Sequence, residues 1–111
     1  MLTQFHETFD VRPEKEQEYV EWMINTYVPF WRKQPGLLAI RGFYTRVGSG
    51  PSLVGEYDFE DFAPLASVVA SDEYRQLKRK METLVTDYES KILVPTGRGD
   101  LYVMPPGDQA S

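Results

Sequence analysis

The chain has 111 residues, of which 41% are hydrophobic and 14% aromatic, and this is enough for one domain with a packed core. It carries 12 basic and 17 acidic residues, and the net charge of −5 argues against nucleic acid or an anionic membrane as a partner. With no cysteine and one histidine, the chain has no means to form a disulfide framework or a thiolate metal site. The sequence shows neither a signal peptide pattern nor a membrane-spanning apolar run, which predicts a cytoplasmic protein.

The first third of the chain predicts a strand followed by a helix. Residues 3–11 alternate between apolar and polar side chains, which is typical of a strand. Pro13 suits the first position of a helix, Pro29 is expected to kink it, and Pro35 is expected to follow its end. One apolar stripe on this helix is predicted to face a sheet, and it consists of Val20, Met23, Ile24, Tyr27 and Trp31.

The middle of the chain predicts a β-hairpin. Residues 37–47 and 52–59 form its strands, and the glycines at 48 and 50 suit the turn between them. Apolar side chains occur at neighbouring positions of the first strand, including Ile40 and Phe43, so both faces of this strand are expected to be apolar. Because two helices cover only one face of a sheet, the other face should carry a broad apolar patch and pair with a second copy. This predicts a homodimer; scattered surface apolar groups on a monomer are the alternative.

The last third predicts a second helix that is broken near Ser71, with a longer part that runs through Tyr88. Either residues 92–94 or residues 101–104 supply a fourth strand. The element order is then β-α-β-β-α-β, so we expect an α+β, ferredoxin-like fold with a four-stranded antiparallel sheet.

The predicted domain covers residues 1–104, and residues 105–111 are expected to form a flexible tail.

Short motifs in this chain resemble the dimeric α/β-barrel superfamily. They are Tyr57-Asp58-Phe59 at the end of a strand and residues 70–74, Ala-Ser-Asp-Glu-Tyr, at the start of a helix. Arg12-Pro13 and residues 93–96, Leu-Val-Pro-Thr, are similar to the NIPSNAP branch in particular. The resemblance covers about residues 3–96 and implies that two ferredoxin-like sheets pair into a dimeric α/β barrel.

The branches of this superfamily imply different functions. The antibiotic-biosynthesis monooxygenase branch implies oxidation of an apolar or aromatic substrate without metal or cofactor, in a pocket between sheet and helices. The heme-degrading branch places an axial histidine where this chain has Lys78, a poor heme ligand, so we expect no heme, flavin or metal. The NIPSNAP branch implies the alternative function, a non-catalytic dimerisation or ligand-sensing module.

Glu7 is the leading candidate for a catalytic residue because it lies between Phe5 and Phe9 on the apolar face of its strand. A carboxylate there loses its hydration, and this raises the pKa toward the range of a general base. The alternatives are an ion pair with Arg41 or Arg46, or a strand edge that is open to water.

Other polar and aromatic residues are weaker candidates. His6 either accepts a proton near a ligand or makes a structural hydrogen bond. Arg41 either holds an anionic or phenolic ligand or joins a salt bridge between subunits. The predicted ligand-binding residues are Arg41, Tyr57, Trp22, Tyr44 and Asn25.

Overall fold

The structure is a computed structural model and describes residues 1–96. Its elements in chain order are β1 (Thr3–Val11), a short 3-10 turn η1 (Pro13–Lys15), α1 (Glu16–Trp22), a π-helical turn η2 (Met23–Tyr27), α2 (Val28–Arg32), β2 (Leu37–Tyr44), β3 (Leu53–Phe59), α3 (Phe62–Val69), α4 (Asp72–Leu84) and β4 (Val85–Leu93).

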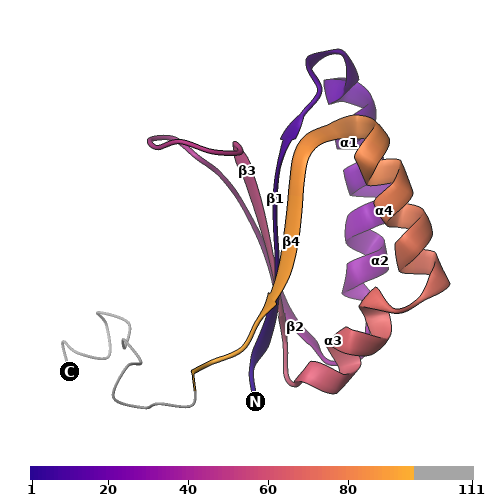
Figure 1. Cartoon of the computed structure of the whole chain (residues 1–111). Helices are drawn as coiled ribbons and strands as arrows, with labels where there is room; N and C mark the ends of the chain where they lie inside the picture. The colour runs from indigo at the N-terminus through magenta and orange to yellow at the C-terminus, as the bar shows by residue number, and fades with distance from the viewer. Residues whose placement is uncertain (97–111) are drawn as a thin grey trace.

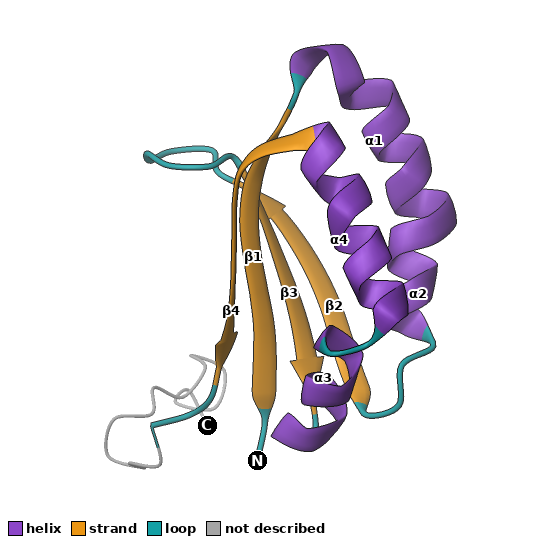
Figure 2. Cartoon of the chain, turned by 45° about the vertical axis from the view of Figure 1, so that its right-hand side comes forward, coloured by secondary structure: helices purple, strands orange, loops and turns teal. Residues whose placement is uncertain are grey.

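The molecule has two layers, a sheet and a set of helices on one side of it (Figures 1 and 2). The sheet has four strands in the order β2-β3-β1-β4, and every neighbouring pair is antiparallel. Within the described part of the chain, no helix covers the other face, which we call the open face (Figure 2). This is the ferredoxin-like α+β fold that the sequence predicts, and the prediction is confirmed.

The core between the two layers is dominated by aromatic rings. Trp31 is fully buried at its centre and stacks on Tyr57, with ring centroids 4.3 Å apart, and on Phe5, at 5.2 Å. Tyr74 of α4 meets the edge of both Phe5 and Trp31. The packing of these rings holds the helices against β1 and β3.

The first helix is interrupted by the π-turn, directly before Pro29. Proline has no N–H and its ring clashes with the carbonyl four residues earlier, so a wider turn at this place avoids the conflict. The predicted apolar stripe is wrong in two positions, because Val20 and Ile24 are 50% and 64% exposed. Tyr19 packs against the core in place of Val20, and Met23, which the stripe already includes, packs there without Ile24.

The second helix ends earlier than predicted. α4 stops at Leu84, and Tyr88 belongs to β4 rather than to the helix. Tyr88 satisfies the spacing of both a helix and a strand, which is why the sequence pattern alone placed it wrongly. The predicted fourth strand at residues 92–94 overlaps the end of β4, whereas the alternative at 101–104 and the predicted tail at 105–111 lie outside the described residues.

The open face is more polar than the sequence predicts. Strand alternation turns Ile40 toward the helices and Arg41 toward the open face, where Arg41 pairs with Glu56 and Asp58 of β3. Of the apolar residues expected there, Phe43 is 51% exposed. The expected apolar patch is therefore interrupted by charged groups, because register places only Phe43, and not Ile40, on this face.

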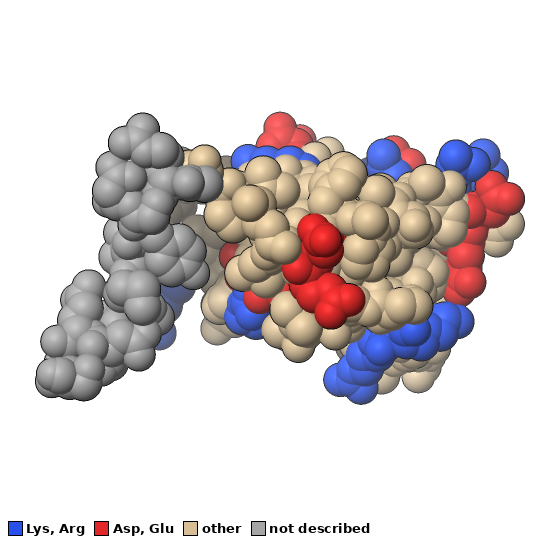
Figure 3. Space-filling model, turned by 90° about the horizontal axis from the view of Figure 1, so that it is seen from below, with Lys and Arg blue, Asp and Glu red and all other residues tan. Residues whose placement is uncertain are grey.

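Charged groups are dispersed over the surface. On the face shown in Figure 3, the basic side chains form small separate groups with acidic ones between them. Among the described residues, no helix is both long and apolar enough to cross a membrane.

Candidate functional site

Glu7 lies in the interior of the molecule, bound by three tyrosine hydroxyls. Its side chain comes from the middle of β1 on the helix-covered face, and the residue is 1% exposed. The hydroxyl of Tyr57 donates to Oε2 at 2.5 Å, while those of Tyr88 and Tyr27 donate to Oε1 at 2.6 and 2.9 Å. Hydroxyl-to-carboxylate hydrogen bonds of 2.5–2.7 Å are of the strong, charge-assisted kind. We call these four residues the tyrosine cage.

Each tyrosine reaches Glu7 from a different element, through a specific local feature. Tyr27 is the last residue of the π-turn, whose extra residue places it over β1. Tyr57 stands on β3 on the same face as Glu7, two residues after Gly55, the pairing partner of Glu7. Tyr88 follows Asp87, which has a φ of 55°, at an irregularity in the pairing of β4 with β1. Such a β-bulge re-aims the side chains next to it.

The environment of Glu7 perturbs its acidity. Desolvation by burial raises the pKa of the Glu7 carboxyl, and the hydrogen bonds from Tyr57, Tyr88 and Tyr27 partly oppose this increase. Burial and the nearby carboxylate raise the pKa values of Tyr27 and Tyr57 well above the ordinary value, so these phenols stay neutral. Each tyrosine is thus a donor to Glu7 rather than a second anion.

The ion pair that the sequence offered as an alternative for Glu7 does not form within residues 1–96. Arg41 instead binds Glu56 at 3.1 Å and Asp58 at 2.7 Å on the open face of the sheet. A strand edge open to water is also excluded, because β1 lies between β3 and β4. Glu7 is therefore a buried carboxyl group whose hydrogen-bond partners in the described chain are neutral.

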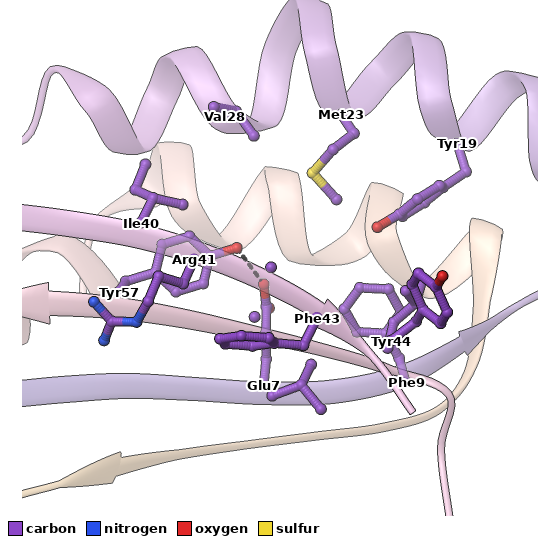
Figure 4. A pocket seen from close by; sticks show the side chains of 14 residues that line it. Glu7, Phe9, Tyr19, Met23, Val28, Ile40, Arg41, Phe43, Tyr44 and Tyr57 are labelled. Atoms are coloured by element: carbon purple, nitrogen blue, oxygen red, sulfur yellow. Dashed lines mark hydrogen bonds between the residues drawn. The ribbon is translucent and has the colours of Figure 1, made fainter. Parts of the chain in front are cut away.

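A cavity of about 350 Å³ opens beside the tyrosine cage, between the first helix and strands β2 and β3 (Figure 4). Two paired glycines, Gly42 and Gly55, lie in its lining and leave the sheet there without side chains. Tyr19, Met23 and Val28 approach it from the helix side (Figure 4). Glu7, Phe9, Tyr44 and Tyr57 also line the cavity.

The two oxygens of Glu7 have different surroundings. Oε1 holds the hydroxyls of Tyr27 and Tyr88, which do not line the cavity. Oε2 holds the hydroxyl of Tyr57, which does line it (Figure 4). A methyl group on Gly55 would lie 3.0 Å from Oε2 and 3.2 Å from the Tyr57 hydroxyl, so both groups sit directly above this glycine. A carboxylate oxygen can accept two hydrogen bonds, and Oε2 receives only one within the described chain.

The structure brings some of the predicted site residues together and separates others. Glu7, Tyr57 and Tyr44 line the cavity, and Arg41 lines it too although its guanidinium is engaged on the open face (Figure 4). His6 belongs to the alternate set of β1 residues and pairs across the sheet with Glu56 and Lys91. It therefore faces away from Glu7, and the two cannot act on one ligand in this cavity.

The two helical candidates lie outside the cavity lining. Trp22 stacks on Tyr27 with a centroid distance of 4.8 Å, so it supports the tyrosine cage from behind. Asn25 is exposed on the π-turn.

Three parts of the site are not predicted from the sequence. Tyr27 was assigned to the core stripe and Tyr88 to a helix, and neither was connected with Glu7. The Gly42–Gly55 pair was not noticed either. A glycine inside a strand is a signal for a close approach or a bulge, and it could have drawn attention to this place.

No group of three or more His, Cys, Asp or Glu side chains within residues 1–96 is arranged to hold a metal ion. Lys78, at the position of the heme ligand in the heme-degrading branch, is exposed on α4. The expected absence of heme, flavin and metal stays a prediction, which absorbance spectra and elemental analysis of the purified protein can test.

Comparisons with known proteins identify the fold. No protein-family model matches the chain. No curated protein matches it by sequence either. Among solved structures, an ethyl tert-butyl ether D family protein from Bacillus halodurans is similar, with 21% identity, a TM-score of 0.66 and coverage of 86% of this chain and 100% of that one.

Two further solved structures share this fold. SnoaB, a cofactor-independent oxygenase from Streptomyces nogalater crystallised as an N63A mutant, has 17% identity and a TM-score of 0.66, with 88% and 96% of the two chains covered. A NIPSNAP-like domain protein from Burkholderia xenovorans has 24% identity and a TM-score of 0.58, with 86% of each chain covered. These likenesses show that the chain has the ferredoxin-like fold that the resemblance implies.

Proposed function

We propose that this chain binds an apolar or aromatic small molecule in the cavity above Gly42 and Gly55, and that Glu7 exchanges a proton with it. The observation that supports this most directly is a carboxyl group that is 1% exposed, has neutral partners and yet lines a cavity. Burial raises the pKa of the Glu7 carboxyl above its ordinary value, which is the direction that a general acid or base requires.

Tyr57 is proposed to work with Glu7. Its hydroxyl is bound to Oε2, the oxygen on the cavity side, so it lies within reach of the same ligand atom. Tyr27 and Tyr88 hold the other oxygen and act as positioning residues, because they fix the carboxyl plane without lining the cavity. A proton acceptor that is held in one orientation in a water-poor cavity is effective in proton abstraction.

An oxygenase-like reaction is the specific form that we propose for this chemistry. The solved structure of SnoaB is described as that of a cofactor-independent oxygenase, and it shares the fold of this chain. Removal of a proton from a phenol or an activated C–H group leaves an electron-rich substrate anion, which can itself reduce dioxygen. The contribution of the protein is then a base, for which we propose Glu7, and a cavity that holds the substrate against it.

A non-catalytic ligand-sensing module is the second candidate function. It is favoured by the number of hydrogen bonds on Glu7, because a carboxylate that already holds three hydroxyls also suits a structural polar cluster. The cavity would then bind its ligand without proton transfer.

A thermal-shift screen with aromatic, quinone and fatty-acid-like compounds tests the site. Compounds that stabilise the wild type should lose their effect in Gly42→Val, which fills the cavity floor where a side chain meets no other atom within 4 Å. Compounds that stabilise both proteins equally bind elsewhere and contradict the proposed site. For a neutral compound that binds, Glu7→Gln should retain binding and abolish its conversion if the protein is an enzyme.

We also propose that two copies pair through the open face of the sheet to form the homodimer. Phe43 and Leu93 on that face are 51% and 42% exposed. The turn between β2 and β3 extends away from the helices, beyond the open face, where it can reach a partner (Figure 1). The cytoplasmic location remains a prediction from the sequence.

A further inference from the structure

Glu7 lacks the counter-charge that a buried carboxylate normally has. Burying an ionised carboxylate costs several kcal/mol unless a cation or a full set of hydrogen bonds compensates it. Here the described chain supplies three neutral hydroxyls and no cation. The guanidinium of Arg41, two strands away on β2, is neutralised by Glu56 and Asp58 on the opposite face.

The free acceptor position of Glu7 is on the cavity side. Oε2 accepts one hydrogen bond, from Tyr57, and lies above Gly55 in the cavity lining. Across the β2–β3 pair, Gly42 leaves open space at the same level. Glu7 is 1% exposed, so a donor group on a ligand in the cavity reaches Oε2 after a small shift of the side chains around it.

The cavity walls are suited to a positive charge. Aromatic side chains from four elements line the cavity, namely Phe9 of β1, Tyr19 of α1, Tyr44 of β2 and Tyr57 of β3. The faces of such rings attract cations by about 0.5–2 kcal/mol, and more strongly when water is excluded. An anionic ligand would instead bring a second negative charge next to Glu7.

We propose that the cavity selects a protonated organic amine with an apolar or aromatic body, whose ammonium group binds Oε2 of Glu7. This inference rests on the proposed function and adds the charge of the ligand to it. The ammonium supplies the counter-ion that the chain lacks, and the body of the ligand occupies the apolar space below the first helix. A neutral ligand of the same shape can enter the cavity but leaves the carboxyl group without a counter-ion.

Three probes with one indole body test this selection by isothermal titration calorimetry at neutral pH. Tryptamine carries an ammonium group, tryptophol a hydroxyl group, and indoleacetate a carboxylate. For the wild type, tryptamine should bind at least about tenfold more tightly than tryptophol, since an ion pair and a cation–π contact are added. Indoleacetate should show no measurable binding.

Variants assign the preference to Glu7. In Glu7→Gln, tryptamine should lose its advantage and bind no more tightly than tryptophol. The matched control is Glu89→Gln, which removes the same charge from an exposed residue of β4 and should keep the full preference. Gly42→Val should weaken the binding of both probes, because its side chain occupies the cavity.

The outcomes separate this inference from the proposed function. If tryptophol binds as tightly as tryptamine to the wild type, or if tryptamine does not bind, the amine selection is wrong. An amine preference that survives in Glu7→Gln also overturns it. If Gly42→Val leaves the binding of every probe unchanged, the cavity is not the binding site, and the proposed function fails together with the inference.

Discussion

Gly42 and Gly55 are paired across strands β2 and β3, yet only one of them lies against another side chain. A methyl group on Gly55 would come within 3.0 Å of Glu7 Oε2 and 3.1 Å of its Cγ, whereas one on Gly42 would meet nothing within 4 Å. Gly55 makes room for the tyrosine cage, and Gly42 makes room for the cavity.

This difference predicts opposite effects of the same substitution. Gly55→Ala should lower the free energy of unfolding by about 1–3 kcal/mol, because it forces Glu7 and Tyr57 out of their packed positions. Gly42→Ala should leave stability unchanged or raise it by up to about 1 kcal/mol, because alanine restricts the unfolded chain. Denaturant unfolding of both variants checks this, and equal destabilisation would contradict the described packing.

The second prediction concerns the pH dependence of stability. Below the ordinary pKa of 4.5, Glu7 is protonated in both the folded and the unfolded chain. Between 4.5 and the raised folded pKa, the folded protein binds more protons than the unfolded one, so the contribution of Glu7 to stability falls as the pH rises through this window. Glu7→Gln does not titrate and should gain stability relative to the wild type across this range.

The size of this gain in stability measures how far the pKa of Glu7 is raised by folding, since each tenfold change in proton affinity corresponds to about 1.4 kcal/mol. The carboxyls of Asp10, Glu18 and Asp61 have lowered pKa values, so their contribution to stability is complete above their ordinary pKa values and is lost as the pH falls below them. They are present in both proteins and cancel in the comparison. A constant stability difference between the wild type and Glu7→Gln from pH 4.5 to 9 would show that Glu7 has an ordinary pKa.

The third prediction separates the charge of Glu7 from its hydrogen bonds. Glu7→Leu leaves three tyrosine hydroxyls without their acceptor, and each buried hydroxyl without a partner costs about 1–3 kcal/mol. Glu7→Gln keeps an acceptor and a polar group in the tyrosine cage. We therefore expect Glu7→Leu to be much less stable than Glu7→Gln at every pH, as measured by urea unfolding. Equal stability of the two variants would show that the tyrosines find other partners.

The fourth prediction tests the bulge that places Tyr88. Asp87 has a φ of 55°, a conformation that costs a β-branched residue about 1–2 kcal/mol or more. Asp87→Val should destabilise the protein by this amount, while Asp87→Gly and Asp87→Asn should be tolerated. If Tyr88 depends on this bulge, Asp87→Val should also weaken the effect of Tyr88→Phe on stability in a double-mutant cycle. If the effects of Asp87→Val and Tyr88→Phe on stability are fully additive, the bulge does not position Tyr88 in the tyrosine cage.

The fold was predictable from local patterns, and the site was predictable only in part. Alternation in residues 3–11 and the apolar helix after Ser71 each reflect a single regular period, and both elements are found. Glu7 was noticeable because it breaks such a period. Tyr27, in contrast, has the spacing of a core residue, and only the π-turn aligns it with Glu7.

The rest of the site depends on strand register, which the sequence does not reveal directly. Register pairs Gly42 with Gly55 and Gly55 with Glu7, and so creates the cavity beside the carboxyl group. It also sends Arg41 and His6 to the open face, although their sequence positions near apolar residues made them equal candidates. A shift of one residue would exchange the two faces, so patterns within single strands cannot assign these residues to a site.

The last prediction concerns the homodimer. If two copies pair through the open face, the wild type should sediment at about twice the chain mass of 12.8 kDa at micromolar concentration. Phe43→Glu should give a monomer, because it places a charge in the contact, and burial of an unpaired charge costs several kcal/mol. The matched control is Phe62→Glu, since Phe62 has the same exposure of 51% but lies at the start of α3, in the helix layer. It should remain a dimer. A monomeric wild type, or a dimer that tolerates Phe43→Glu as well as Phe62→Glu, would show that the open face is not the interface.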